Sequence, residues 1–221
     1  MKKNKVFIKA AALALAVLMP VTLALASCKN DEREYIEFSG DYPSVKYIEA
    51  LANDRYFIDF SLFSDGVIIY NTVARDGDAL ESRSNYGGSV THALAKDGDT
   101  YFIDDKNGVY FKADTAFDGG LYGAVDYSKA EYIGSGTEKI AIGEYDYDEF
   151  SCKTISGDDC GVKLYVDDGG KLAAIVDYSG ESLIERDIAE FSSEIPDGWL
   201  KIPKGFKLVD EDSYFEEYYG K

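Results

Sequence analysis

The chain has 221 residues, a formal net charge of −18 at pH 7 and a sequence pI near 4.4. So acidic a chain is repelled by phosphate backbones and by anionic lipid head groups, which excludes nucleic acid as a partner. Its 18 tyrosines and 12 phenylalanines favour strands and disfavour an all-helical fold.

The first residues have the features of a bacterial export signal. Residues 1–5 are cationic, and residues 10–25 carry no charge but fall short of the ~20 apolar residues that a membrane span needs. The uncharged run ends in Leu25-Ala26-Ser27-Cys28, which resembles the lipobox of bacterial lipoproteins. That resemblance implies cleavage before Cys28 and acyl chains on its sulfur, which would anchor the protein to a membrane. The alternatives are a signal anchor or ordinary secretory cleavage at residues 24–26.

Cleavage would define the remaining organisation. Without the signal peptide, residues 1–27, the chain keeps 194 residues, with 19 basic and 41 acidic side chains and a net charge of −22. Such a surface cannot hold the protein to an anionic membrane, so the acyl chains must. We expect Cys28 and a polar tether over residues 28–42, then one domain over residues 43–221. The expected location is the cell envelope, on the outer side of the cytoplasmic membrane or on the outer membrane.

The domain begins with a predicted helix and continues as a meander. Residues 43–53 predict a short helix that Ser44 can cap, since apolar residues recur at helical spacing. From Arg55 the hydrophobic period changes to two. Asp-Gly, Gly-Gly and Asn-Gly turn signals then recur about every ten residues, as in a meander of antiparallel strands.

The middle of the chain breaks this rhythm. Residues 113–136 are rich in glycine, and we interpret them as a crossover or lid with a helix over residues 121–127. Strands resume from residue 140 to residue 191, and residues 210–219 predict a closing helix. Several strands are apolar on both faces, which indicates that one face packs on helices while the other curves around a partly apolar hollow.

A family resemblance follows from these segments. A capped helix, the strand sequence Tyr56-Phe57-Ile58-Asp59-Phe60, the turn Ser64-Asp65-Gly66 and a long meander together resemble the half-barrel of periplasmic lipoprotein carriers and of related lipid-carrier lipoproteins. Glu138-Lys139-Ile140 and Ile202-Pro203-Lys204-Gly205-Phe206 are similar to segments of small lipoproteins of gut bacteria. The resemblance spans most of residues 43–209. It implies an α+β fold, with a curved antiparallel half-barrel of about ten strands around a few short helices and an apolar cavity for acyl chains.

The cysteines and the histidine carry the remaining chemistry. Cys152 and Cys160 are separated by seven residues and can form a disulfide across the arms of a hairpin in an exported protein. The alternative is two free thiols. His92 is the only histidine and lies far from both, so we expect a core or surface residue, no metal site and no cofactor.

No catalytic motif is present, and we expect no enzymatic activity. Carboxylates such as Asp146, Asp148 and Glu149 lie close together, but nothing in the sequence marks a buried member of a catalytic pair. No segment fits an EF-hand calcium loop.

Three functions are compatible with these features. The first is a tethered, non-enzymatic binder of lipid or of another apolar ligand. The second is a protein-interaction or sensor-partner module with no cavity but with an exposed aromatic patch. A weaker alternative is a carbohydrate-active hydrolase. The candidate cavity residues for the first function are Tyr56, Phe57, Ile58, Phe60, Tyr101, Phe102, Tyr110 and Phe111.

Overall fold

The computed structural model describes residues 34–115, 117 and 125–218. Contacts divide the chain into two units, Met1–Glu34 and Tyr35–Lys221. The predicted signal peptide and Cys28 lie outside the described residues. Within the described part of the chain, no helix is long and apolar enough to cross a membrane.

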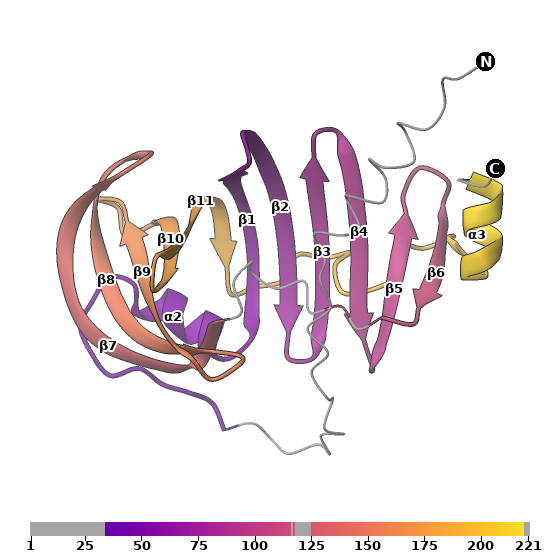
Figure 1. Cartoon of the computed structure of the whole chain (residues 1–221). Helices are drawn as coiled ribbons and strands as arrows, with labels where there is room; N and C mark the ends of the chain where they lie inside the picture. The colour runs from indigo at the N-terminus through magenta and orange to yellow at the C-terminus, as the bar shows by residue number, and fades with distance from the viewer. Residues whose placement is uncertain (1–33, 116, 118–124, 219–221) are drawn as a thin grey trace. The chain divides into compact units, whose positions relative to one another are not determined.

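The second unit is built on one open, curled sheet of twelve strands (Figure 1). The strand order is β12-β6-β5-β4-β3-β2-β1-β11-β10-β9-β8-β7. Neighbours are antiparallel except β12, which runs parallel to β6. The strands are β1 (Arg55–Ser64), β2 (Val67–Asp76), β3 (Ala79–Tyr86), β4 (Ser89–Lys96), β5 (Asp99–Asp104), β6 (Val109–Ala113), β7 (Val125–Ile140), β8 (Gly143–Thr154), β9 (Asp159–Val166), β10 (Leu172–Ser179), β11 (Ser182–Ser192) and β12 (Lys207–Leu208).

Two short helices complete the unit, α2 (Val45–Ala52) and α3 (Glu211–Tyr218). Both confirm helices predicted from the sequence, and the α+β class and the open curved sheet are confirmed as well. Turns such as Asp65-Gly66 have positive φ at both residues, as the type I′ hairpin requires. The expected number of about ten strands was too low.

The largest error concerns residues 113–136. Residues 125–136 belong to β7, a strand of 16 residues that pairs with β8 and contains two register shifts. Its Gly136 serves close packing rather than a loop, since a Cβ there would lie 2.7 Å from the Tyr147 hydroxyl. The helix expected over residues 121–127 lies mostly outside the described residues, and its end is strand.

The curled half of the sheet, β7–β11 with β1, wraps around α2 (Figure 1). Ile48 and Leu51 of α2 share one buried cluster with strand residues including Phe60, Leu164 and Ile175. We call the face that α2 covers the inner face of the sheet, and the opposite face the outer face. Because successive side chains of a strand alternate between faces, each strand supplies residues to both.

Hydrogen bonds fix the first turn of α2 against the strands. The Tyr47 hydroxyl donates to Gly170 O at 2.8 Å and accepts from the Leu172 N–H at 3.1 Å, in the β9–β10 turn region. Ser44 occupies the N-cap position, but its hydroxyl makes no capping hydrogen bond. Instead its N–H donates to Asp148 Oδ2 at 2.9 Å, and Ser135 Oγ donates to Asp148 Oδ1 at 2.5 Å.

The chain that precedes α2 also packs on the unit. The N–H of Ile36 donates to Asn53 Oδ1 at 2.9 Å, and the N–H of Phe38 donates to Glu49 Oε1 at 3.0 Å. Tyr42 is buried and stacks on Tyr132 of β7, with ring centroids 4.6 Å apart. Packed structure therefore begins before Pro43, inside the segment expected as a tether.

Two segments cover parts of the sheet away from α2. Residues 193–206, which we call the strap, link β11 to β12 and are seen behind the strands in Figure 1. Trp199 of the strap packs edge-on against Phe57 of β1, with centroids 5.2 Å apart. At the far edge, Tyr214 of α3 packs on Phe111 of β6 and donates to Asp104 Oδ2 at 3.0 Å.

Asp148→Ala should lower the free energy of unfolding by about 1–3 kcal/mol, because it leaves the buried N–H of Ser44 without an acceptor. Urea unfolding of the full chain measures this change. Asp146→Ala, at an exposed position of the same strand, is the matched control and should cost within about 0.5 kcal/mol. Equal losses in the two variants would show that Asp148 does not hold α2.

Candidate functional site: the outer face of the sheet

The predicted cavity residues of β1 lie in packed structure. Tyr56, Ile58 and Phe60 belong to the inner-face cluster beneath α2, and each is at most 3% exposed. Phe57 points to the outer face and contacts Trp199 of the strap. The alternation of faces expected for adjacent aromatics is therefore present, but both faces are covered at this position.

The other four predicted cavity residues lie on β5 and β6. Phe102 stacks on Phe111 with centroids 5.6 Å apart, and both join the small cluster with Tyr214. Tyr101 and Tyr110 pack edge-on against each other, with centroids 5.9 Å apart. These four are therefore separate from the β1 set. Neither of the two main depressions in the described structure is lined by any of the eight residues.

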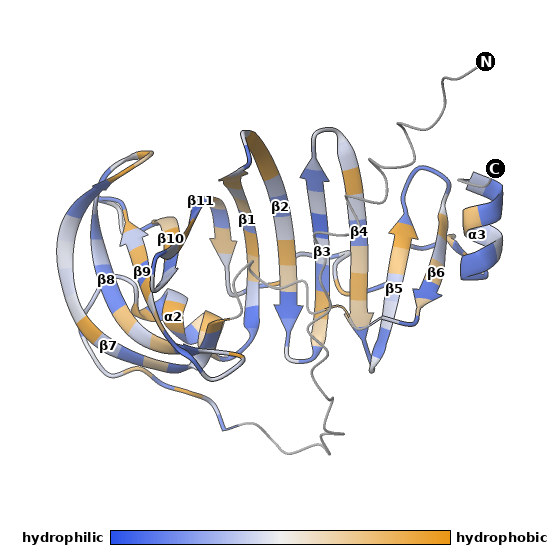
Figure 2. Ribbon diagram, viewed as in Figure 1, coloured by the Kyte–Doolittle hydropathy of each residue, from blue (hydrophilic) through white to orange (hydrophobic). Residues whose placement is uncertain are grey.

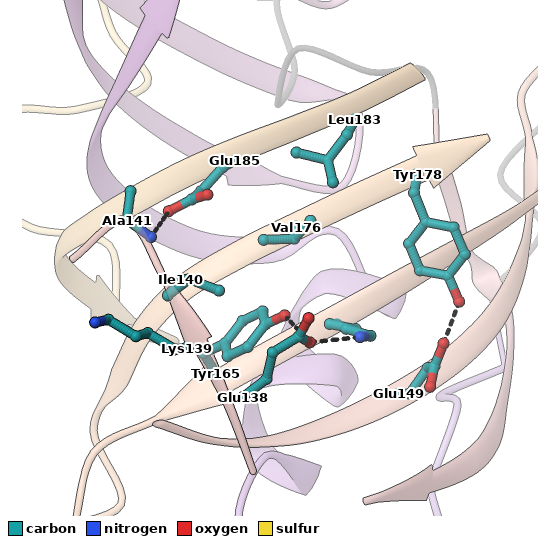
Figure 3. A pocket seen from close by; sticks show the side chains of 11 residues that line it. Glu138, Lys139, Ile140, Ala141, Glu149, Tyr165, Val176, Tyr178, Leu183 and Glu185 are labelled. Carbon is teal, nitrogen blue, oxygen red and sulfur yellow. Dashed lines mark hydrogen bonds and ion pairs between the residues drawn. The ribbon is translucent and has the colours of Figure 1, made fainter. Parts of the chain in front are cut away.

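The larger depression is open to solvent and lies on the outer face of the curled half (Figure 3). Its volume is about 640 Å³, and strands β7 to β11 supply most of the side chains around it. A second open depression, of about 570 Å³, lies between β6 and α3 and is lined mainly by polar residues. The larger one is lined by Glu138, Lys139, Ile140, Ala141, Glu149, Lys163, Tyr165, Val176, Tyr178, Leu183 and Glu185.

Two of the three glutamates in this depression are satisfied by neighbours. Glu138 Oε2 accepts from Lys163 Nζ at 2.6 Å and from the Tyr165 hydroxyl at 3.0 Å, and these hydrogen bonds lower the pKa of Glu138. The Tyr178 hydroxyl donates to Glu149 Oε1. Both groups are therefore held by the sheet itself (Figure 3).

Two acids of β11 form no ion pair among the described residues. Glu185 accepts the Ala141 N–H, at 3.2 Å, and burial raises its pKa. Asp187 lies on the same face, because it pairs with Ser61 of β1, and burial raises its pKa too. Its Oδ1 is buried without a hydrogen-bond partner in the described structure. Sequence analysis did not single out either residue, since nothing in the sequence shows which carboxylates lack a partner.

Exposed apolar side chains continue from the depression across the outer face. Phe63 of β1 pairs with Ile68 of β2, and Tyr70 is aligned through Asn85 with Val90 of β4. With Leu183 of β11, which lines the depression, they form what we call the apolar strip. Their exposed fractions are 73% for Phe63, 50% for Ile68, 58% for Tyr70, 65% for Val90 and 63% for Leu183. The hydrophobic end of the β1–β2 hairpin, at its upper turn, is visible in Figure 2.

The sequence contained a signal for this strip that we interpreted differently. The run Val67-Ile68-Ile69-Tyr70 is apolar on both faces, which led us to expect a second packed or hollow face. In the structure the inner-facing residues are partly covered, whereas Ile68 and Tyr70 are exposed.

The strap covers the outer face beside the apolar strip, and hydrogen bonds to a buried polar cluster hold it there. Glu81 is fully buried and accepts from His92 Nε2 at 2.8 Å, from Arg83 Nη2 at 2.8 Å and from the Leu200 N–H at 2.6 Å. His92 Nδ1 lies 2.8 Å from Asp105 Oδ2. Since both ring nitrogens face carboxylates, both bonds form together only when the imidazole is protonated. Arg83 also lies over the Trp199 ring, 4.3 Å from its centroid.

The stability that this cluster contributes depends on pH through Glu81. Burial alone would raise its pKa, but hydrogen bonds from His92 and Arg83 outweigh that effect and hold the pKa of Glu81 below its usual value of 4.5. A group whose pKa is lowered by folding stabilises the protein above its unfolded pKa, and that stabilisation is lost as the pH falls through the folded value. His92 thus has a structural role in the core, as the sequence analysis allowed.

Glu81→Gln should therefore destabilise the chain most above pH 4.5. The difference in unfolding free energy from the unsubstituted chain should shrink as the pH falls from 4.5 through the lower folded pKa of Glu81, because the carboxylate becomes protonated first in the unfolded state and then in the folded state. Urea unfolding at a series of pH values measures the difference. Leu208→Ser, at an exposed position that carries no ionisable group, should show a difference that does not vary with pH. A constant difference for Glu81→Gln would contradict the assignment.

A second buried charge pair lies on the inner face. Arg186 Nη2 is 2.7 Å from Asp177 Oδ2, and the two side chains are 0% and 7% exposed. Burial raises the pKa of Asp177, and Arg186 and the nearby Tyr127 act in the opposite direction. The attraction within such a pair is offset by the hydration that both groups lose, so its net contribution to stability is small, whereas removal of one partner would leave a buried charge unpaired.

Cys152 and Cys160 are directly opposite each other on β8 and β9. Both are free thiols in the structure, so the expected disulfide is not formed there. Burial raises the pKa of the Cys152 thiol to about 12 and raises that of Cys160 as well. Their register nevertheless matches the predicted bridge, which remains a prediction.

The bridge can be tested by non-reducing peptide mapping of the chain taken from its host's membranes. We expect a peptide that joins Cys152 to Cys160, because exported proteins meet oxidising conditions and this register places the side chains together. If the thiols are instead recovered alkylated by iodoacetamide, there is no bridge. Cys152 should then react more slowly than Cys160 at pH 8, since its higher pKa leaves less thiolate.

No group of three or more metal-ligating side chains occurs among the described residues. The depression does contain glutamates with opposite pKa shifts, Glu138 lowered and Glu185 raised, as a glycoside hydrolase would need. However, Glu138 is tied to Lys163 and Tyr165, and the depression is open to water rather than enclosed. The geometry therefore offers a surface for contact more than a site for chemistry.

No family model matches the sequence, and no curated protein matches it. Several solved structures are similar to part of the chain. An uncharacterized conserved protein from Thermus thermophilus is similar with 7% identity and a TM-score of 0.40, over 75% of this chain and 95% of that one. LprF from Mycobacterium bovis is similar with 11% identity and a TM-score of 0.40, over 75% of this chain and 100% of that one. The Pseudomonas aeruginosa MucA/MucB complex contains a chain with 14% identity and a TM-score of 0.36, over 70% of this chain and 57% of that one. At such low identities and TM-scores, none of these similarities carries an argument about function.

Proposed function

We propose that this chain is a membrane-tethered, non-enzymatic interaction module of the cell envelope that docks a polypeptide partner on the outer face of its sheet. The observation that carries the proposal is the apolar strip, whose five large side chains are each at least 50% exposed on one face. Contiguous exposed apolar surface on a soluble domain marks an interaction site, whereas scattered single residues do not.

The inner face supports docking on the outer face rather than lipid binding in a hollow. α2 fills the curl, and the largest strand side chains beneath it, such as Phe60 and Leu164, are at most 1% exposed. A carrier of acyl chains needs an enclosed apolar space, whereas the two depressions described above are open to solvent. Lipid binding remains the alternative, and a carbohydrate hydrolase is a weaker one.

The tether is the second part of the proposal and rests on the sequence. The lipobox-like Leu25-Ala26-Ser27-Cys28 would place acyl chains on Cys28 and leave the acidic domain free beside the membrane. Because a mature net charge of −22 repels anionic lipid, the domain would face outward and not lie on the bilayer. A docking face on such a domain is accessible to other envelope proteins.

Photo-crosslinking in the host tests this function. A benzophenone amino acid at Phe63 or Tyr70 replaces one ring by another on the apolar strip, so the fold is preserved. We expect both positions to give an adduct with the same polypeptide. Tyr86 is the matched control, since it is 47% exposed at the same end of the sheet but lies on the inner face. Adducts that form equally at Tyr86, or at none of the three positions, would contradict docking on the outer face.

A further inference from the structure

The apolar strip and the larger depression lie on the same, outer face of the sheet. Leu183 belongs to both, and it pairs with Tyr178 in the wall of the depression. Glu185, two residues further along β11, is also in that wall and pairs with Val176. Asp187 follows on the same face and pairs with Ser61 of β1, two residues from Phe63 of the strip. These two acids of β11 thus stand between two apolar areas.

Glu185 and Asp187 differ from Glu138 and Glu149, the other two acids that line the depression. Glu138 and Glu149 receive hydrogen bonds from Lys163, Tyr165 and Tyr178, whereas Glu185 receives one from a backbone N–H. Asp187 has a buried oxygen with no partner among the described residues. Burial has cost both carboxylates part of their hydration, and the described structure returns a backbone hydrogen bond to Glu185 and none to Asp187 Oδ1. A cation on a partner would compensate the two carboxylates for the hydration that they lose on burial.

We propose, on the basis of the docking function above, that the partner presents a basic segment in which Lys or Arg side chains are flanked by apolar ones. Its cations would pair with Glu185 and Asp187, and its apolar side chains would cover Leu183, Phe63 and Ile68. Arg suits Glu185 well, because its planar guanidinium can bond a carboxylate at two points. The strong negative charge of the whole domain would also speed the approach of a basic segment.

An acidic membrane surface does not fit the same site. Its head groups carry the same sign of charge as Glu185 and Asp187, and the whole mature chain carries −22. A second copy of this chain fits no better, since two such faces would bring four carboxylates together. Of the three occupants considered, the negative charge of the surface therefore favours a basic polypeptide over an anionic membrane or a second copy of this chain.

Fluorescence anisotropy with short labelled peptides tests the inference. The full chain is held in nanodiscs of neutral phosphatidylcholine, and the probes alternate Leu with Lys, Leu with Glu, or Ser with Lys. We expect the Leu–Lys peptide to bind at least about tenfold more tightly than either of the others, since only it supplies both contacts. Added salt should weaken that binding, because the ion pairs are partly exposed.

Variants locate the binding on the proposed surface. Glu185→Gln combined with Asp187→Asn should weaken Leu–Lys binding about tenfold, and Leu183→Ser should weaken it by a similar factor. Asp168→Asn and Leu208→Ser are the controls. Leu208 is 61% exposed, as Leu183 is 63%, but lies on β12 at the other edge of the sheet. The controls should bind like the unsubstituted chain.

The outcomes separate this inference from the proposed function. Equal binding of the Leu–Lys and Leu–Glu peptides, or equal weakening by the control variants, would overturn the basic partner. If no peptide binds while Phe63 still crosslinks to a protein in the host, the partner is not basic and only this inference fails. If neither is seen, the docking function fails as well. Binding to vesicles of anionic lipid that is lost in Leu183→Ser would also overturn the basic partner.

Discussion

The docking of α2 inside the curled half of the sheet is the contact on which the remaining structure depends. The eight-residue helix α2 covers the inner face of the curled half, which consists of β1 and β7–β11. Hydrogen bonds to the buried Asp148 and from Tyr47 fix its position. Burial of apolar surface contributes about 25 cal/mol per Å², so the packing of α2 on this face stabilises the curled half. With α2 on the inner face, the strap is the segment among the described residues that covers part of the outer face.

The strap covers the outer face only in part. Its Trp199 and Leu200 reach Phe57 and the buried Glu81, where Arg83 and His92 complete a hydrogen-bonded cluster. Beyond that point the same sheet carries exposed Phe63, Ile68 and Tyr70. The strap thus covers the outer face around Phe57 and Glu81, and the adjacent apolar strip stays exposed. An uncovered apolar area beside a covered one is the arrangement expected of a docking face.

The β7 edge of the sheet is less suited to binding a partner than the outer face is. β7 lies at the edge of the described sheet beside β8, and an unpaired strand edge is a place where a further strand can pair. It carries charged residues, among them Lys129, Glu131, Glu138 and Lys139, and it bends at two register shifts. Charged side chains and bulges are the usual protection of edge strands against pairing. The apolar strip has no such protection.

Local signals in the sequence predicted the elements that local physics determines. α2 followed from its apolar spacing, and the hairpins of β1–β6 followed from turns such as Asp65-Gly66 that need positive φ. β7 was missed because Gly136 resembles a loop residue but serves contact with Tyr147 of the next strand. The Glu81–His92 cluster, and the lack of an ion pair at Glu185 and Asp187 among the described residues, depend on which strands become neighbours. No short-range pattern encodes that, so the candidate site became visible only in the structure.

Native mass spectrometry of the full chain released from its host's membranes tests the central claim most directly, since it weighs whatever remains bound. If α2 fills the inner face and the outer face docks a partner, the spectrum should show the chain alone or with one polypeptide. Acyl chains should then appear only as covalent mass on Cys28. A stoichiometric, noncovalently bound lipid that leaves on collisional activation would show an occupied hollow and contradict the account.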